Sequence, residues 1–441
     1  MSVSFQSMTG DLIINSNLFK IVSFISSLFL VLFPFSIVVL HDVHGVVIAL
    51  SLVLALTLPF IHRETLGLDL GEKRFFISVI CMTMSVIFVS AYAGIDEVIL
   101  KKLFKYVYLL LVIPVYFLFR TIKVNYGLVW YGLFVGALVS ALYGINQTMR
   151  DPVFDAVFVW RAEGVTNPII YGDIALLLGI MCLAGTGWFR SKSNWLVVLP
   201  VLAVIMGLVA SALSHSRGGW IAIPILLIVF IWYSRLYISK YTQLISILAI
   251  VSIVLAIYLI PQTRVEQKLE ESIANVQMYF DSDVESQYRN TSIGIRLEAW
   301  KAAWFVFIDN PLIGVGWGNL QEHAKVYVDK GVLNKSSIIY SHPHNQFLSV
   351  MASGGIVASV AILFLFYTPF RAFYKACRSS ELSADARRMA LAGILLIVGF
   401  VIFNLSESFL ERSRTVSFFI FYLAVFMAGI RETNTEAINH K

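Results

Sequence analysis

The sequence predicts an all-α integral membrane protein with about twelve transmembrane helices. Of its 441 residues, 58% are hydrophobic and 14% are charged, and the mean hydropathy is +0.80. Soluble domains carry about 25% charged residues, so this composition excludes a water-soluble globule, a disordered chain and a fibrous repeat. Apolar runs of about 20 residues recur along the chain, and such runs form helices in lipid because a helix satisfies its own backbone hydrogen bonds.

Twelve apolar runs are predicted to span the membrane. They cover residues 18–40, 43–62, 75–95, 100–120, 125–148, 169–188, 195–213, 219–234, 241–261, 345–369, 388–406 and 414–430. The first run is too long for a cleavable signal peptide and lacks a small-residue cleavage site. The chain is therefore expected to divide into spans 1–9 (residues 1–261), a helical external loop (262–344), and spans 10–12 with the C-terminus (345–441).

Lysine and arginine in alternate loops predict the orientation, because cytoplasmic loops are enriched in these residues. The loops predicted to be cytoplasmic carry Arg63, Lys73, Arg74, Arg120, Lys123, Arg190, Lys192, Arg235, Lys240, Arg371, Lys375, Arg378, Arg387 and Arg388. Both termini then lie in the cytoplasm. Topology accounts for most of the net charge of +6, so no nucleic-acid partner is predicted. Lys101, Lys102 and Lys105 are an exception on the outer side, which we assign to a helix end.

Few local motifs indicate a cofactor. Cys81, Cys182 and Cys377 lie in or beside apolar runs or a basic loop, so neither a disulfide framework nor a cysteine metal site is predicted. No dinucleotide fingerprint, P-loop, zinc spacing or fixed-period repeat is present. The triplet Gly314, Gly316 and Gly318 is predicted to form a turn, and Asp281-Ser282-Asp283 a loop rather than a metal site.

Several arginines fall on the predicted outer face, where the orientation rule does not explain them. They are Arg161, Arg217, Arg289, Arg296, Arg412 and Arg414. A guanidinium fork binds phosphate oxygens bidentately and stays charged where water is scarce, so several forks at a lipid interface would bind a diphosphate. After Arg217, Gly218 and Gly219 would let a bulky ligand approach the backbone.

Structural roles for these arginines stay open. A single interfacial arginine often anchors a helix or binds lipid head groups. Arg412 and Arg414 have Glu407 and Glu411 nearby, and Arg161 has Glu163 within reach, so ion pairs are an alternative role for all three.

The external segment contains two predicted helices. Residues 265–280 have helical character and a charged face, to which we assign no chemistry. Residues 296–308 are predicted as an amphipathic helix whose apolar face carries Leu297, Trp300, Trp304, Phe307 and Ile308. This face is expected to lie along the bilayer or cap a cavity; packing against a neighbouring helix is the alternative.

A histidine pair precedes the tenth predicted span. In His342-Pro343-His344, His344 is expected at or near the first turn of the helix, at the outer membrane surface. Histidine is the side chain whose unperturbed pKa lies nearest neutral pH, so His344 is our candidate general base. A hydrogen-bonded helix cap and a metal ligand remain alternatives for this residue.

Three segments together resemble the O-antigen ligase and O-antigen polymerase superfamily. They are SHSRGGW (214–220), GIRLEAWKAAWFVFIDNPLIGVGWG (294–318) and HPHNQFLSVMASGG (342–355). The resemblance implies a GT-C-like membrane glycosyltransferase that uses no metal. The family's arginine in S-R-G-G corresponds to Arg217, its histidine to His344 with Gly354 ten residues later, and its R-x-x-x-W arginine to Arg296. Arg161 matches a weaker pattern, and Arg289 is inferred from position alone.

The resemblance further implies the reaction and its partners. The donor would be O-antigen linked to undecaprenyl diphosphate, and the acceptor the lipid A-core oligosaccharide, at the periplasmic face of a bacterial inner membrane. His344 would take the acceptor proton in an inverting displacement, and Arg161, Arg217 and Arg289, with Arg296, would bind the diphosphate. No cofactor is expected.

Alternatives remain from the same superfamily and from a different class. An O-antigen polymerase or a protein O-glycosylating relative would use similar residues. A transporter or flippase is the competitor, for which Asp173 and Asn404 are the polar candidates inside predicted spans.

Overall fold

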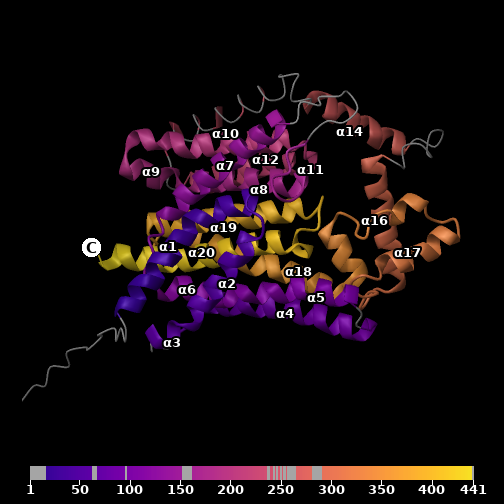
Figure 1. The fold of residues 1–441 in the computed structure, drawn as a ribbon, viewed down its shortest axis with the longest axis horizontal. Helices are drawn as coiled ribbons and strands as arrows, with labels where there is room; N and C mark the ends of the chain where they lie inside the picture. The colour runs from indigo at the N-terminus through magenta and orange to yellow at the C-terminus, as the bar shows by residue number, and fades with distance from the viewer. Residues whose placement is uncertain are drawn as a thin grey trace, which may run out of the picture.

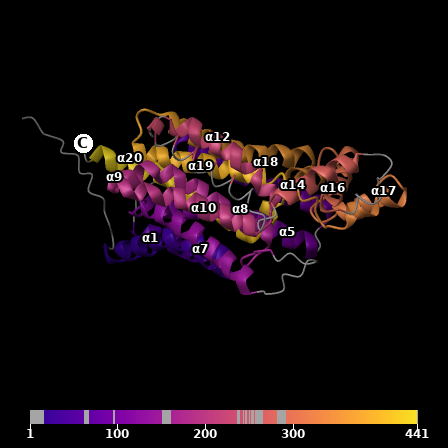
Figure 2. The ribbon, with the colours of Figure 1, turned by 90° about the horizontal axis from the view of Figure 1, so that it is seen from above.

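The computed structural model describes residues 16–61, 67–94, 97–150, 161–235, 265–280 and 291–439, with scattered positions between 239 and 255. Every regular element within these residues is a helix, which confirms the all-α prediction. Figures 1 and 2 show most of the helices running side by side in one bundle.

Within the described residues, eight helical stretches are long and apolar enough to cross a membrane. They are Asn17–Val39, Leu70–Ala93, Leu128–Met149, Pro168–Lys192, Asn194–Leu213, Gln346–Arg378, Ala384–Phe403 and Ser413–Thr433. Two shorter apolar helices, Val43–Leu56 and Gly218–Ser234, coincide with the second and eighth predicted spans. The multi-pass prediction is thereby confirmed, while the predicted span 241–261 lies almost wholly outside the described residues.

The first half of the chain forms α1 to α12 with three short 3-10 helices. The helices are α1 (Ser16–Val39), α2 (Val43–Leu56), α3 (Leu58–Ile61), α4 (Leu70–Ala93), α5 (Glu97–Val107), η1 (Tyr108–Leu111), α6 (Val112–Thr121), α7 (Leu128–Arg150), α8 (Pro168–Cys182), η2 (Leu183–Gly185), α9 (Thr186–Lys192), η3 (Asn194–Val197), α10 (Val198–Leu213), α11 (Arg217–Trp220) and α12 (Ala222–Ser234). The predicted span 100–120 is therefore three consecutive pieces, α5, η1 and α6.

The second half supplies the segment that was predicted to be external and the last spans. Its helices are α14 (Val265–Tyr279), α16 (Ser292–Asp309), α17 (Leu320–Asp329), η5 (Lys335–Ile338), α18 (Gln346–Arg378), α19 (Ala384–Phe403), η6 (Phe409–Glu411) and α20 (Ser413–Asn439). The two predicted external helices are confirmed as α14 and α16. Asn404, expected inside a span, instead follows the last residue of α19 as its C-cap.

Burial divides the bundle into a centre and a lipid-facing periphery. The most apolar windows are 94% buried in the span Pro168–Lys192 and 83% buried in those of α19 and α20, against 50% in that of α1. Peripheral helices expose large apolar side chains such as Phe24, Phe88 and Ile228, as expected of surfaces that contact lipid. The mean hydropathies of the two groups overlap, at 1.6–2.0 for the three most buried spans and 1.8–2.7 for the others, so hydropathy alone does not separate them.

Small residues allow the central helix α8 to approach α10 closely. A Cβ added to Gly179 would lie 2.5 Å from the carbonyl oxygen of Ala203, and one added to Gly207 would lie 2.7 Å from that of Ala175. Two glycines, one on each helix, thus bring the backbones together, a packing mode common between membrane helices.

The bundle has two distinct ends. Helices α14, α16 and α17 lie at one end, opposite the C-terminus, in both views (Figures 1 and 2); we call it the capped end. The other, the charged end, carries the predicted cytoplasmic cations at the ends of α6, α9 and α18, including Arg120, Lys192 and Arg378. These cations share one end, as predicted; that this end faces the cytoplasm stays a prediction.

Helix α18 is interrupted at Gly355, and a neighbouring turn supplies hydrogen bonds to the backbone groups that the interruption leaves without helical partners. Gly355 has φ 60° and ψ −158° inside the helix. The carbonyls of Ala352 and Ser353 accept from the amides of Val315 and Gly316, at 3.1 and 2.8 Å. The amides freed beyond the break donate to the carbonyls of Pro311 and Leu312. The triplet Gly314, Gly316 and Gly318, each with positive φ, forms the predicted turn, and its function is to complete α18.

We predict that Gly355→Ala destabilises the protein. A Cβ there would lie 2.4 Å from the backbone of Leu312, and the positive φ is strained for any L side chain, so the loss should be at least about 1–3 kcal/mol. The thermal midpoint of the detergent-solubilised protein, followed by tryptophan fluorescence, should fall by several degrees. Gly45→Ala on α2, where nothing lies within 4 Å of an added Cβ, is the control. An equal midpoint for both variants would contradict the assigned role of Gly355.

Candidate active site at the capped end

The loops at the capped end are tied together by backbone hydrogen bonds. The amide of Ala162 donates to the carbonyl of Leu213 at 3.0 Å, and the amide of Gln346 donates to the carbonyl of Asn404 at 2.8 Å. The first bond joins the loop before α8 to the last residue of α10. The second joins the start of α18 to the loop between α19 and α20. Each bond joins segments that are distant in sequence.

The sequence Asn345-Gln346 anchors the start of α18. The side chain of Asn345 caps the helix by accepting from the amides of Phe347 and Leu348. The fully buried side chain of Gln346 accepts from the amide of Leu410 at 2.9 Å and donates to the Tyr106 hydroxyl at 2.9 Å. These bonds fix the residues just before them, His342 to His344, against the α19–α20 loop.

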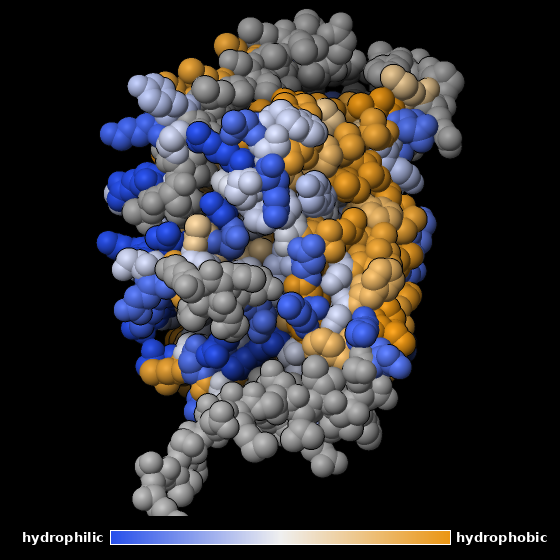
Figure 3. All heavy atoms as spheres, turned by 90° about the vertical axis from the view of Figure 1, so that its left-hand side faces the viewer, coloured by the Kyte–Doolittle hydropathy of each residue, from blue (hydrophilic) through white to orange (hydrophobic). Residues whose placement is uncertain are grey.

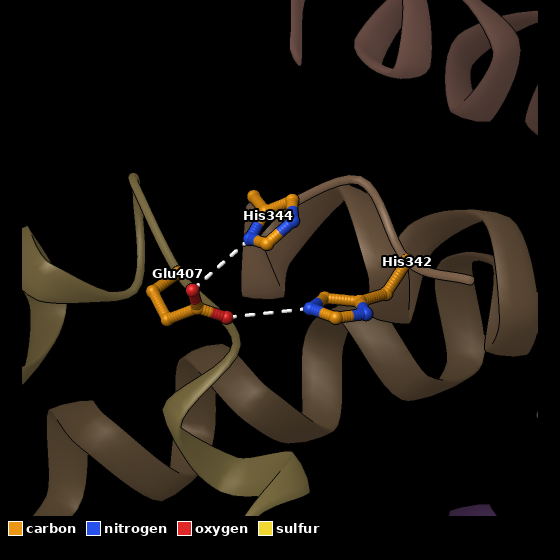
Figure 4. Close-up of side chains that lie close together, drawn as sticks. All are labelled: His342, His344 and Glu407. Carbon is orange, nitrogen blue, oxygen red and sulfur yellow. Dashed lines mark hydrogen bonds and ion pairs between the residues drawn. The ribbon is translucent and has the colours of Figure 1, made fainter. Parts of the chain in front are cut away.

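One carboxylate joins the two histidines (Figure 4). His344 Nδ1 lies 3.0 Å from Glu407 Oε2, and His342 Nε2 lies 3.3 Å from Glu407 Oε1. The amide of Ser408 also donates to Glu407 Oε1, at 3.0 Å, and Arg412 lies 3.6 Å from the same oxygen. Glu407 is 1% exposed, so a nearly buried negative charge has four partners.

The charge state of Glu407 fixes the tautomer of His344. Burial by itself would raise the pKa of Glu407, but hydrogen bonds from His342 and His344 and the amide of Ser408 hold it well below its usual range. An ionised carboxylate only accepts hydrogen bonds, so His344 Nδ1 must carry a proton. Nε2 of the neutral ring then has a lone pair, and it makes no hydrogen bond with any described residue. This is the arrangement that a general base requires.

His344 is held in an unusual backbone conformation. It has φ 49°, in the left-handed region, and lies two residues before α18 begins, near the first turn, as expected. Among described non-glycine residues only Asp42 and His215 share this feature, and His215 also belongs to the capped end. Backbone strain of about 1–3 kcal/mol is typical of functional sites.

Helix α16 docks on the histidine segment through Trp300. Its indole Nε1 donates to the carbonyl of Pro343 at 2.8 Å. The partly buried Arg296 lies one turn earlier on the same helix. Three of the six buried residues of α16 are alanines, and none is aromatic, while Trp304 and Ile308 are 49% and 52% exposed. The expected alternative, packing of the aromatic face against a helix, is therefore wrong for these two side chains.

Arg161 supports the loop that carries Arg217. Arg161 Nε donates to the carbonyl of Ser214 at 2.9 Å, and a terminal nitrogen donates to that of His215 at 3.4 Å. Both bonds are to backbone carbonyls, and the ion pair with Glu163 stays an alternative. Its guanidinium is nevertheless at the exposed surface of this loop, and Arg217 itself begins α11. The side chain of Arg217 lies outside the described part of the structure.

Gly218 and Gly219 serve a packing role that the sequence did not indicate. A Cβ on Gly218 would lie 2.6 Å from Ser406 Oγ, and one on Gly219 would lie 2.0 Å from Asp173 Oδ1. The two glycines let α11, which begins at Arg217, pack closely against α8 and against the α19–α20 loop, which contains Glu407. The close approach that the structure shows is to the protein's own residues, and the approach of a ligand to these glycines stays a prediction.

Asp173 is a buried polar centre beneath this loop. It is fully buried on α8, its Oδ1 accepts from Ser216 Oγ at 3.5 Å, and its Oδ2 has no hydrogen-bond partner among described residues. Glu407 and Arg296 both lie within electrostatic range of it. Arg296 and Ser216, the residue before Arg217, thus both lie near the carboxylate of Asp173.

The remaining outer cations have structural partners. Arg412 forms the expected ion pair with Glu407, whereas Arg414 donates to the carbonyl of Ile37 at 2.7 Å, near the end of α1. Lys102, an exception to the orientation rule, lies 3.6 Å from Glu411; although burial opposes it, this charge helps to lower the pKa of Glu411. Arg289, like the Asp281-Ser282-Asp283 segment, falls outside the described residues.

The histidine cluster could also hold a metal ion. The ligand atoms of His342, His344 and Glu407 all lie within 4.8 Å of one another. Zinc binds histidine nitrogen and carboxylate oxygen at about 2.0–2.2 Å, whereas each histidine here faces a carboxylate oxygen at hydrogen-bonding distance. The geometry favours a hydrogen-bonded cluster, and metal binding requires rearrangement.

Sequence reasoning missed the main partner of His344. Glu407 was considered only as an ion-pair partner of Arg412 or Arg414, and Asp173 only as a polar residue within a span. For each of these two carboxylates the sequence predicts some partner, because a carboxylate in or next to a membrane span is energetically costly unless it is paired. The sequence does not indicate which residue that partner is.

Comparison with known proteins supports the resemblance. Residues 201–363 match the family described as O-antigen ligase. An uncharacterized protein of Haemophilus influenzae is 26% identical over 324 residues, covering 73% of this chain and 77% of that protein. An O-antigen ligase of Salmonella typhimurium is 26% identical over 232 residues, covering 51% of this chain and 50% of that protein. The match bears out the resemblance read from the motifs, and the matched residues include Arg217, Arg296 and His344, but not Arg161 or Glu407.

We predict that Glu407→Gln lowers stability and weakens its acid dependence. A neutral amide replaces a carboxylate that has four partners, which should cost about 1–3 kcal/mol at neutral pH. Because the pKa of Glu407 is depressed in the folded protein, its contribution is present above the unfolded pKa of about 4.3 and is lost as the pH falls below that value. Below about pH 5 the thermal midpoint of the wild type should therefore fall more steeply than that of the variant.

Glu97→Gln is the matched control for this prediction, since Glu97 is 80% exposed in its pair with Lys101 and exposed pairs contribute little. Parallel acid profiles for the wild type and Glu407→Gln would show that the carboxylate is not stabilised as described.

Proposed function

We propose, on the premise that residues 201–363 carry an O-antigen ligase domain, that this protein transfers O-antigen from undecaprenyl diphosphate to lipid A-core oligosaccharide. The family supports a ligase- or polymerase-type membrane enzyme of lipopolysaccharide biosynthesis. The capped end would then face the periplasm of a bacterial inner membrane. One observation carries the proposal. The imidazole of His344 is oriented by Glu407, and α11, which begins at Arg217, packs beside the loop that contains Glu407.

His344 acts as the general base. A hydroxyl of the acceptor sugar attacks the anomeric carbon of the donor and loses its proton to His344 Nε2. The new glycosidic bond forms as the bond from the anomeric carbon to the diphosphate oxygen breaks, and undecaprenyl diphosphate leaves with the bonding electron pair. A single displacement of this kind inverts the anomeric configuration. Glu407 stabilises the imidazolium that forms, as buried carboxylates do in catalytic triads.

Arginines stabilise the departing diphosphate. Arg217, Arg161 and Arg296 all belong to segments of the capped end, and Arg289 is expected there from its position in the sequence. Charge develops on the bridging oxygen as the bond breaks, and fixed positive groups act most strongly there. Because a diphosphate already leaves readily, guanidinium groups can take the place of a divalent cation.

Acceptor identity distinguishes this proposal from its alternatives. A polymerase would use the same residues on another O-antigen chain, and a flippase would move the donor across the membrane without bond cleavage. Both alternatives are outcomes of the experiment that follows.

We predict that His344→Ala and Arg217→Ala each abolish the long lipopolysaccharide ladder at equal membrane abundance. Loss of the base should cost about 10²–10⁴ in rate and loss of one charge donor about 10²–10³. Lipopolysaccharide gels of cells that express each variant would measure the effect, and carrier-linked glycan should accumulate outside.

Matched variants separate chemistry from folding. His323→Ala on α17 removes an exposed histidine whose ring lies 3.0 Å from the carbonyl of Asn319, and it should keep the ladder. Shortened chains with single units still attached would instead identify a polymerase, and carrier-linked glycan trapped in the cytoplasm would identify a flippase. A normal ladder from His344→Ala would refute the assignment of the base.

We predict that metal chelation leaves the purified enzyme active. The reaction should proceed at an unchanged rate after dialysis against EDTA, because arginines bind the diphosphate and no step requires a cation. Loss of activity that returns with zinc or magnesium would contradict this mechanism and favour metal binding at His342, His344 and Glu407.

A further inference from the structure

A pocket of about 810 Å³ lies at the charged end, remote from the candidate active site. It is formed by the first turns of α4, the second half of α18 and the last turns of α20. Helix α18 begins beside His344, and Arg371 in the pocket comes 25 residues after Gln346. At 1.5 Å per residue this corresponds to about 35–40 Å, which exceeds the thickness of the hydrocarbon core. The pocket therefore lies near the opposite membrane surface.

The inner wall of the pocket is electrically neutralised by its own residues. Glu72 accepts from the Tyr116 hydroxyl and lies 3.3 Å from Arg120 and 2.7 Å from Arg431. Arg431 also lies 2.7 Å from Asp69, whose side chain caps α4. The two carboxylates and two arginines of this network balance each other.

The other cations of the pocket are not neutralised in this way. Arg74, Arg371 and Lys375 line it, are exposed, and have no carboxylate within ion-pair distance among the described residues. Glu432 is the third acidic residue of the lining, so five cations face three carboxylates. The pocket carries a net positive charge.

An exposed apolar strip leads to these cations along α18. Val360, Leu363 and Tyr367 are 60%, 61% and 55% exposed. Arg371 and Lys375 continue from Tyr367 at intervals of four residues, so they lie on the same helix face. Figure 3 shows hydrophilic side chains gathered at this end beside a broad hydrophobic flank. A molecule with an anionic head group and apolar chains fits this arrangement, in which an apolar strip on α18 leads to a group of cations.

We infer that this pocket binds the head group of an anionic phospholipid of the adjacent leaflet. The phosphate lies between Arg371, Lys375 and Arg74, and the acyl chains lie along the strip of Val360, Leu363 and Tyr367. Guanidinium forks bind phosphate oxygens bidentately, and basic pockets between membrane helices recognise anionic head groups. The inference does not depend on the proposed transferase function.

Phosphatidylglycerol is the probe for this site. The full-length protein, purified in detergent, is titrated with phosphatidylglycerol or with phosphatidylcholine, and bound lipid is counted by native mass spectrometry. The wild type should retain phosphatidylglycerol preferentially. The double variant Arg371→Ala/Lys375→Ala should bind it at least about tenfold more weakly, because each surface cation near anionic lipid contributes about 1 kcal/mol.

The matched control removes the same amount of charge from two of the helices that form the pocket, α4 and α18. Lys73→Ala/Arg378→Ala changes cations that do not line the pocket and should bind phosphatidylglycerol as the wild type does. The single variant Arg74→Ala, expected to weaken binding about fivefold, tests the same site if the double variant fails to fold. Equal binding by the pocket and control variants, or equal thermal stabilisation by inorganic phosphate and by phosphatidylglycerol, would overturn the inference.

Discussion

The candidate site depends on one buried carboxylate. Glu407 lies in the loop between α19 and α20, 63 residues after His344, and it holds two histidines from the loop before α18. A buried negative charge is costly unless it is compensated, so the carboxylate forces both loops and Arg412 into a single arrangement. The same bonds that compensate the charge also fix the His344 tautomer. The contacts that stabilise this part of the fold are therefore also the ones that orient His344 for its proposed role as a base.

The break in α18 contributes to this arrangement from the other side. Because Gly355 interrupts the helix, its free carbonyls bind the turn after α16, and α16 is thereby fixed to α18. Trp300 on α16 then reaches the carbonyl of Pro343. The motif residues that are distant in sequence act as one unit: the glycines position the helices, and the helices position the histidines.

The charged side chains at the two ends of the bundle are paired differently. At the capped end, acidic side chains bind cations or histidines, and the glycines of the Arg217 loop pack against Asp173 and Ser406. At the charged end, the network around Glu72 is balanced, and further cations remain beside it. The proposed chemistry at one end and the inferred lipid site at the other are compatible because α18 separates them by its own length.

The sequence by itself determined the helices, most of the spans and the resemblance to O-antigen ligases, because an apolar run in lipid can satisfy its backbone only as a helix and because motifs are local. It also predicted roles for His344 and for the arginine-bearing loops, which stay predictions. Only the tertiary structure decided that Glu407 orients His344, that the buried residues of α16 include alanines but no tryptophan, and that Gly218 and Gly219 pack against Ser406 and Asp173. These contacts join loops between helices, and loop packing follows from how whole helices fit together, which no local pattern records.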